Sequence, residues 1–176
     1  LCFCHPDDAP EQRADQEATV KRLYESARRN RLEFLLEIIP SKVGAIAPDT
    51  TATLIRQFYQ AGVYPDWWKL EPMATADAWA SAVAAIEEFD THTRGIVVLG
   101  LDAPEDALAA SFAVAAGFPL VKGFAVGRTI FGSVARAWFE GDLSDAEAVA
   151  EMARRYERLC GIWDAARAKA QAVAAE

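Results

Sequence analysis

Two ionisable residues lie inside apolar segments that are typical of buried strands. Lys69 belongs to the run 66–70, and Glu37 is embedded in the run 34–39. Burying an ammonium group without a partner costs free energy or lowers the pKa of the group. Lys69 must therefore either form an ion pair or take part in a reaction. A lysine of lowered pKa attacks carbonyl carbons to form Schiff bases, and a carboxyl group of raised pKa transfers protons. We therefore predict that Lys69 is a nucleophile and that Glu37 is a general acid–base.

Other interpretations of these residues stay open. Lys69 could be one half of a buried ion pair with Glu37 or Glu71 and have no catalytic role. Glu71, shortly after Lys69, is also a candidate for binding substrate. Lys122, in the apolar segment 120–126, is a rival nucleophile, but its strand neighbours supply no carboxylate. We therefore favour Lys69.

Gly127 and Arg128 follow the last apolar segment, at the start of a predicted helix. A glycine lets the backbone approach a ligand closely, a helix N-terminus offers N–H groups, and a guanidinium binds oxygen anions with two donors. These residues predict a phosphate site, with Lys122 as a further candidate for it. The alternative is that Gly127 merely marks a helix boundary.

Polar residues also follow the first apolar segment. His5, Asp7 and Asp8 are candidates for binding substrate hydroxyls, and the two aspartates could instead cap the next helix or hold a magnesium ion. A zinc site with several histidines is excluded because the sequence has only one other histidine, His92, which precedes a strand and belongs to the opposite end. We interpret Asp102 as a turn residue and expect no metal and no cofactor.

The composition limits the classes of protein to consider. The 176 residues are 52% hydrophobic and 25% charged, which predicts one globular domain over 1–176. The formal charge of −8 argues against nucleic acid or a membrane surface as partner, because both attract clustered cations. No apolar run approaches the roughly 20 residues that span a bilayer. The cysteines suggest no disulfide framework, and we expect a cytoplasmic protein.

Apolar segments alternate with helical patterns along the chain. The predicted strands are 1–4, 32–39, 66–70, 94–100 and 120–126. This alternation predicts an α/β fold with a parallel sheet, either doubly wound or closed as a barrel. Glu37, Lys69 and Arg128 lie near the carboxyl ends of strands, where TIM barrels place their chemistry, so we predict a TIM-barrel-type (β/α) repeat. Five of eight βα units are present, and we expect that roughly three precede them in a complete barrel of about 250 residues.

Local signals mark several helix boundaries. Asp49 could cap the helix that carries Leu54 and Ile55. Ser144 and Glu147 have the spacing of a capping box, in which each side chain binds the backbone N–H of the other residue. This spacing predicts that the last helix begins at residue 144.

Several of these motifs resemble an uncharacterised domain found as the C-terminal partner of 5-dehydro-2-deoxygluconokinase in bacterial inositol catabolism. The resemblance covers essentially the whole chain and is carried by residues 5–8, 35–40, 65–72, 99–104 and 122–131. The domain is in turn distantly similar to class I tagatose-bisphosphate aldolases, which are TIM barrels. That similarity maps the Schiff-base lysine onto Lys69, the assisting glutamate onto Glu37, and a glycine–arginine element onto Gly127 and Arg128.

The resemblance implies a substrate and partners. It implies aldol cleavage of 6-phospho-5-dehydro-2-deoxygluconate to dihydroxyacetone phosphate and malonate semialdehyde, with the phosphate at Gly127 and Arg128. It also implies a fused or associated sugar kinase domain, and we expect a homo-oligomer. One alternative is a non-catalytic sugar-phosphate-binding or kinase-supporting module. Another is an isomerase or epimerase that uses Glu37 as base and a metal on Asp7 and Asp8.

Overall fold

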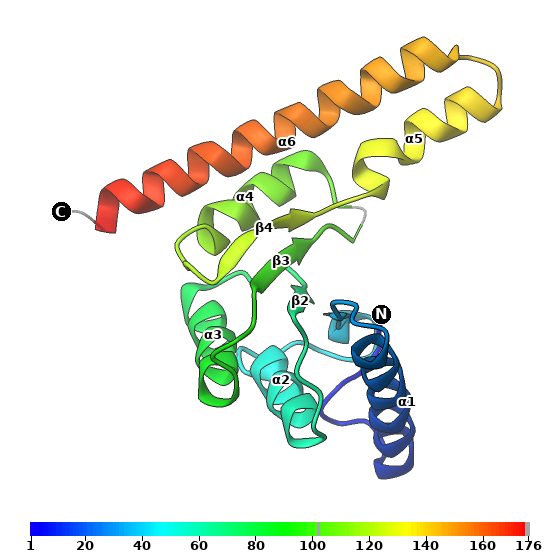
Figure 1. The fold of residues 1–176 in the computed structure, drawn as a ribbon. Coiled ribbons are helices and arrows are strands. Elements are labelled where there is room, and N and C mark those ends of the chain that lie inside the picture. The colour runs from blue at the N-terminus through cyan, green and yellow to red at the C-terminus, as the bar shows by residue number, and fades with distance from the viewer. Residues whose placement is uncertain (102, 175–176) are drawn as a thin grey trace.

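The computed structural model describes residues 1–101 and 103–174 and contains a four-stranded parallel sheet with helices (Figure 1). The turn predicted at Asp102 lies outside the described residues. The elements in chain order are α1 (Pro10–Arg29), β1 (Leu35–Glu37), the 3₁₀ helix η1 (Pro40–Lys42), α2 (Thr50–Gln60), β2 (Trp67–Leu70), α3 (Ala76–Phe89), β3 (Gly95–Leu99), α4 (Glu105–Ala115), β4 (Val121–Ala125), α5 (Arg128–Phe139) and α6 (Asp145–Ala174).

The strands lie in the sheet in the same order as in the chain, β1-β2-β3-β4, and each pair of neighbours is parallel. The predicted parallel sheet is therefore confirmed. In a doubly wound sheet the strand order reverses at a switch point. The order of the four described strands contains no such reversal. Because all four are parallel, their carboxyl ends lie at one edge of the sheet.

The prediction of a strand over residues 1–4 is wrong in its length. Only Cys2 pairs with the sheet, through a parallel bridge to Ile38. Its N–H donates to the Glu37 carbonyl at 2.7 Å, and its carbonyl accepts from the Ile39 N–H at 3.0 Å. The chain then turns, with the Asp8 N–H bonded to the His5 carbonyl at 3.0 Å. The described sheet thus has four strands and one added bridge rather than five strands.

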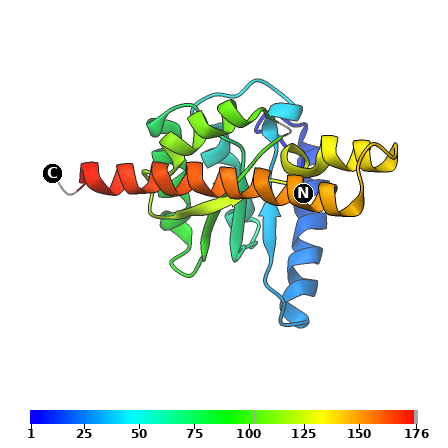
Figure 2. The same cartoon turned by 90° about the horizontal axis from the view of Figure 1, so that it is seen from above.

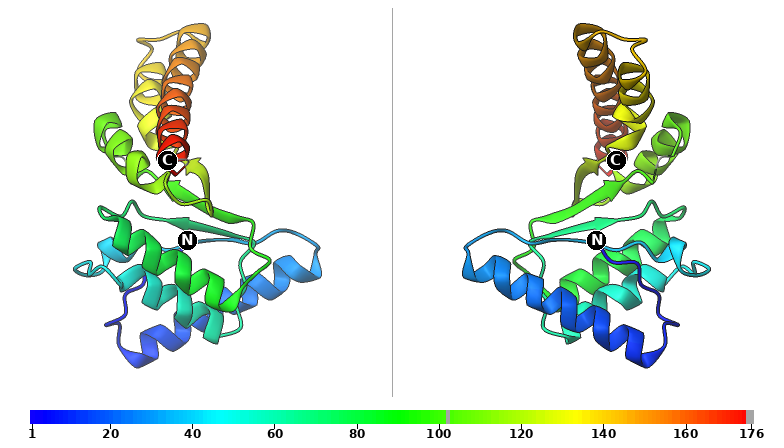
Figure 3. Two further views of the ribbon diagram at one scale, coloured as in Figure 1. Left: turned by 90° about the vertical axis from the view of Figure 1, so that its left-hand side faces the viewer. Right: turned by 90° about the vertical axis from the view of Figure 1, so that its right-hand side faces the viewer.

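One face of the sheet forms the core. Trp68 and Leu70 of β2 are fully buried, whereas the alternate residues Trp67 and Lys69 are only partly buried. This alternation arises because successive side chains of a strand point to opposite faces. The buried face packs against helical side chains, for example the Tyr59 ring of α2, whose centroid is 5.6 Å from that of Trp68. Figure 3 shows α1, α2 and α3 together on one side of the strands.

The long helix α6 closes the described chain. It packs along α4 and α5 (Figures 1 and 2), and its Trp163 meets Phe112 of α4 edge-on at 5.5 Å between centroids. Its first turn is a capping box: the Ser144 N–H donates to Glu147 Oε2 at 2.9 Å, and the Glu147 N–H donates to Ser144 Oγ at 3.4 Å. The predicted capping box is thus confirmed. None of the helices in the described residues combines the length and the apolar character needed to cross a membrane.

The second face of the sheet remains partly open. Leu35 of β1 is 44% exposed on this face, and Phe3 beside it is 52% exposed. Glu37 and Lys69 project from the same face as Leu35, because they occupy alternate positions of paired strands. This face therefore carries the polar groups for which the sequence predicts chemistry.

Candidate functional site

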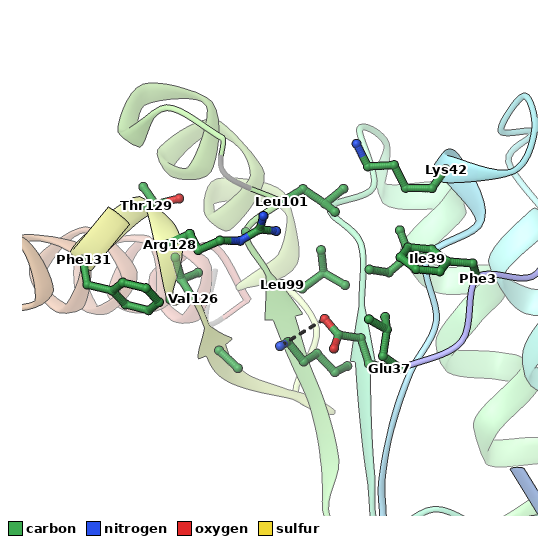
Figure 4. Close-up of a pocket in the computed structure, with 15 residues that line it drawn as sticks. Phe3, Glu37, Ile39, Lys42, Leu99, Leu101, Val126, Arg128, Thr129 and Phe131 are labelled. Atoms are coloured by element: carbon green, nitrogen blue, oxygen red, sulfur yellow. Dashed lines mark ion pairs between the residues drawn. The ribbon is translucent and has the colours of Figure 1, made fainter. Parts of the chain in front are cut away.

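A cavity of about 810 Å³ opens at the carboxyl ends of the strands (Figure 4). Its floor includes Glu37 of β1, Lys69 of β2 and Leu99 of β3. Segments that follow the strands form its walls, among them Arg128 after β4 and Lys42 after β1. Parallel sheets bind ligands at this edge because their connecting loops converge there.

Glu37 and Lys69 form an ion pair in this cavity. They are directly opposed in the register of β1 and β2, and Lys69 Nζ lies 3.0 Å from Glu37 Oε1. The Lys69 side chain is 23% exposed and the Glu37 side chain 19%, and both line the cavity. Figure 4 marks their ion pair by the dashed line at Glu37. Partial enclosure makes the attraction between the charges stronger than it would be in water. The counter-ion of Lys69 is thus Glu37 and not Glu71.

Gly127 and Arg128 border the same cavity. Gly127 is the N-cap of α5 and Arg128 is its first residue. A Cβ atom at residue 127 would lie 3.0 Å from the Phe131 ring, so a larger residue would push against a second lining side chain. The structure therefore brings the predicted phosphate-binding pair to the cavity that contains Lys69 and Glu37.

Lys42 is a lining residue that the sequence analysis missed. It ends η1, which directly follows the strand that carries Glu37. Its position after the carboxyl end of a predicted strand is the signal that could have identified it. Among the described lining residues, Lys42, Lys69 and Arg128 are cationic and only Glu37 is anionic, although the whole chain carries a formal charge of −8. Such a lining favours anionic ligands.

Glu71 lies apart from this cavity. It is 8% exposed, and its carboxylate accepts hydrogen bonds from the backbone N–H of Ser41, at 3.0 Å, and from the Ser41 hydroxyl. A buried carboxylate needs such donors. The structure thus gives Glu71 a role in holding the turn at residue 41, and it borders a separate hollow with Pro72 and Met73.

His5, Asp7 and Asp8 form a hydrogen-bonded turn outside the lining of the Lys69 cavity. The buried His5 ring binds the Ala45 carbonyl through Nε2 at 2.9 Å and the Asp7 N–H through Nδ1 at 3.2 Å. Asp8 Oδ2 accepts from the His5 N–H at 2.8 Å. The N-cap of α1 is Ala9, which makes no side-chain capping bond, so neither aspartate caps that helix. The side chains of His5 and Asp8 thus stabilise this loop, and Asp7 contributes its backbone N–H.

Lys122 also lies outside the cavity. It is the extra residue of a β-bulge: Ile96 pairs with Val121, whereas Val97 pairs with Gly123. The bulge interrupts the alternation of side chains, and Lys122 Nζ donates to the Pro119 carbonyl at 2.8 Å near the amino end of β4. The rival nucleophile is therefore separated from Glu37.

Metal ligands do not cluster within the described chain: it holds no group of three or more histidine, cysteine or acidic side chains that could bind an ion. His92 is exposed in the turn before β3, at the end of the sheet remote from the cavity, as its position before a strand predicts. Asp7 and Asp8 lie outside the cavity lined by Glu37. The metal-dependent isomerase alternative therefore finds no support in the arrangement of these residues.

Cys2 and Cys4 are buried free thiols beside the first bridge. A hydrogen bond between the two thiols lowers the pKa of Cys2, and this bond together with burial raises the pKa of Cys4 well above its usual range. Thiolate is the reactive form of cysteine, so Cys4 is held in its unreactive state. Neither thiol lines the cavity of Lys69.

The fold and the cavity define an α/β protein with a cationic pocket at the carboxyl edge of a parallel sheet, and with an ion-paired lysine in that pocket. The chain belongs to DUF2090, described as an uncharacterised protein conserved in bacteria, whose family model matches residues 1–167. No curated protein matches the sequence. Membership of an uncharacterised bacterial family agrees with the predicted resemblance, while the kinase partner and the similarity to aldolases stay predictions.

Proposed function

We propose that this protein is a class I aldolase that cleaves a ketose phosphate, with 6-phospho-5-dehydro-2-deoxygluconate as its substrate. The observation that carries the proposal is the ion pair of Lys69 and Glu37, 3.0 Å apart, in a cavity where the other charged residues of the described lining are the cations Lys42 and Arg128. An amine beside a proton acceptor is the arrangement that Schiff-base chemistry requires. A cationic wall suits a phosphorylated substrate.

The chemistry begins with Lys69. Its ammonium passes a proton to Glu37, and the free amine attacks the ketone carbon to give a carbinolamine. Glu37 then protonates the carbinolamine hydroxyl, which leaves as water while the nitrogen lone pair forms the iminium. General acid–base catalysis of this kind needs the proton carrier within hydrogen-bond reach, and the Lys69–Glu37 distance satisfies that condition.

Carbon–carbon cleavage follows from the iminium. Loss of the proton from the hydroxyl on the β-carbon lets the bond between the α- and β-carbons break. Its electron pair moves into the iminium to form an enamine, and the aldehyde fragment departs. Protonation of the enamine and hydrolysis of the resulting iminium release the ketone phosphate and restore Lys69. Glu37 serves as the proton carrier in these steps also.

Gly127 and Arg128 would hold the phosphate. The first turn of α5 borders the cavity, and N–H groups at a helix start favour anions. The guanidinium of Arg128 points into the cavity (Figure 4). A phosphate bound there would place the neighbouring carbonyl carbon of the substrate toward Lys69.

The proposed architecture is a TIM-barrel-type (β/α) repeat. It is supported by the order of the described strands, β1-β2-β3-β4, all parallel, because barrel strands follow each other in this way. It is also supported by the position of the cavity at the carboxyl edge, where barrel enzymes build their active sites. In this proposal the open face of the sheet is the barrel interior.

Borohydride trapping tests the function. Reduction in the presence of dihydroxyacetone phosphate should attach the ligand covalently to the protein, at the peptide that contains Lys69, as measured by intact and peptide mass spectrometry. Lys69→Ala should lose the adduct, and Lys122→Ala, outside the cavity, should keep it. A folded protein that forms no adduct, yet is stabilised thermally by the ligand, would contradict the aldolase and favour a non-catalytic sugar-phosphate-binding or kinase-supporting module.

A further inference from the structure

We propose that Lys42 binds a second anionic group of the substrate, so that the cavity selects ketose phosphates with a carboxylate at the far end of the chain. This inference rests on the proposed function for the position of the ketone and the phosphate. Lys42 and Arg128 both line the cavity of Lys69, and Figure 4 shows them on opposite sides of it, Lys42 above Ile39 and Phe3. Two separate cationic positions match a ligand with two anionic ends.

The ammonium of Lys42 is available for a ligand. It makes no hydrogen bond or ion pair with residues 1–101 or 103–174. In contrast, Lys69 is paired with Glu37, and Lys122 donates to the Pro119 carbonyl. Lys42 is therefore the lysine of this cavity whose charge the described chain does not neutralise.

The turn that carries Lys42 is held firmly in place. Pro40, the first residue of η1, is buried, and Ser41 is bound through both its backbone N–H and its hydroxyl to the buried carboxylate of Glu71. The Glu71–Ser41 contacts connect the residue that follows β2 to η1 and fix the backbone at the base of the Lys42 side chain. A preorganised backbone lowers the entropy lost when a side chain binds a ligand. Glu71 is accordingly a positioning residue for Lys42.

The order of groups in the cavity defines the substrate class. Arg128 takes the phosphate, Lys69 takes the ketone next to it, and Lys42 takes a carboxylate at the other end of the carbon chain. Cleavage between these ends leaves the phosphate on the fragment bound to Lys69 and the carboxylate on the departing aldehyde. Lys42 therefore contacts only the aldehyde half of the substrate.

Two non-reactive probes test this assignment without Schiff-base chemistry. 6-Phosphogluconate carries a phosphate and a carboxylate at its ends, and glucitol 6-phosphate has a neutral hydroxymethyl group in place of the carboxylate. Neither contains a ketone. Titration calorimetry should show that the protein binds 6-phosphogluconate about tenfold more tightly, as expected for one charge-assisted hydrogen bond.

Lys42→Gln should abolish this preference and leave the affinity for glucitol 6-phosphate unchanged. Lys42→Arg should keep it because the charge is retained, and Lys122→Gln is the matched control that should also keep it. Equal affinities of the unmodified protein for both probes, no binding of either probe, or a preference that survives Lys42→Gln would overturn the assignment. Failure of borohydride trapping would refute the aldolase chemistry but would not change this preference, so the two failures are distinguishable.

Discussion

Glu37 and Lys69 oppose each other on neighbouring parallel strands, and Glu37 Oε1 lies 3.0 Å from Lys69 Nζ. The proposed proton acceptor is therefore in direct contact with the proposed nucleophile. The ion pair holds Lys69 through its ammonium group, and an ammonium is not nucleophilic. When the substrate replaces solvent in the cavity, transfer of the Lys69 proton to Glu37 would free the amine to attack the carbonyl carbon. The two interpretations of Lys69, ion-pair partner and nucleophile, are therefore compatible in this geometry.

Glu37→Gln should slow aldol cleavage by about 10² to 10⁴, the range for loss of a general acid–base. Glutamine keeps the shape and the hydrogen-bonding capacity of the side chain but cannot carry the proton. Steady-state kinetics with the ketose phosphate would measure the change, with circular dichroism to verify the fold. Unchanged turnover would show that Glu37 is only the counter-ion of Lys69.

Arg128→Ala should raise KM with little change in kcat. A phosphate contact remote from the breaking bond stabilises the bound substrate and the transition state equally. Its loss therefore weakens substrate binding without slowing the chemical step. Lys122→Ala should leave both constants unchanged because that side chain lies outside the cavity. A fall in kcat at unchanged KM would mean that Arg128 acts on the reacting atoms.

Tyr59→Phe should destabilise the fold. The Trp68 indole N–H donates to Tyr59 Oη at 3.0 Å, and both side chains are buried. Phenylalanine would leave the indole N–H without an acceptor, at a cost of about 1–3 kcal/mol in the free energy of unfolding measured with urea. The control Tyr64→Phe, at a half-exposed position, should change it by less than about 0.5 kcal/mol. Equal effects of both substitutions would contradict this account.

The Tyr59 hydroxyl should also make the stability of the fold depend on pH. Burial raises the pKa of Tyr59 well above its ordinary value of 10.0. The unfolded chain therefore loses this proton first, and the stability associated with neutral Tyr59, complete below pH 10, is lost as the pH rises above that value. Unfolding free energies measured across the alkaline range should fall more steeply for the unmodified protein than for Tyr59→Phe.

Gly95→Ala should destabilise the start of β3. Gly95 has φ of +138°, and a Cβ atom there would lie 2.6 Å from the Leu120 carbonyl oxygen. Backbone strain and overlap should together cost more than about 1 kcal/mol. The matched control is Gly161→Ala in α6, where a Cβ atom would meet nothing within 4 Å. This substitution should stabilise the helix by up to about 1 kcal/mol. A neutral Gly95→Ala would refute the predicted clash.

Long-range contacts explain what the sequence analysis missed. Glu71 follows Lys69 closely in sequence, yet its partner is Ser41, and the His5 ring binds Ala45. Asp49 stands at the N-cap of α2 but makes no side-chain capping bond. The bulge at Lys122 reverses the side-chain alternation that a regular strand predicts. The contacts of Glu71 and His5 depend on neighbours 30 and 40 residues away, which the local pattern does not contain.

The sequence by itself determined the alternation of strands and helices, the parallel sheet and the Ser144–Glu147 capping box, because these depend on periodicity and on contacts within one turn. It also placed Glu37 and Lys69 near one edge, since parallel strands share their direction. Only the tertiary structure decided which charged side chains share the cavity. The register of β1 and β2 pairs Glu37 with Lys69, and the Glu71–Ser41 contact fixes the turn that carries Lys42. The bulge in β4 keeps Lys122 out of the cavity. Each of these positions is set by packing between segments that are distant in the sequence.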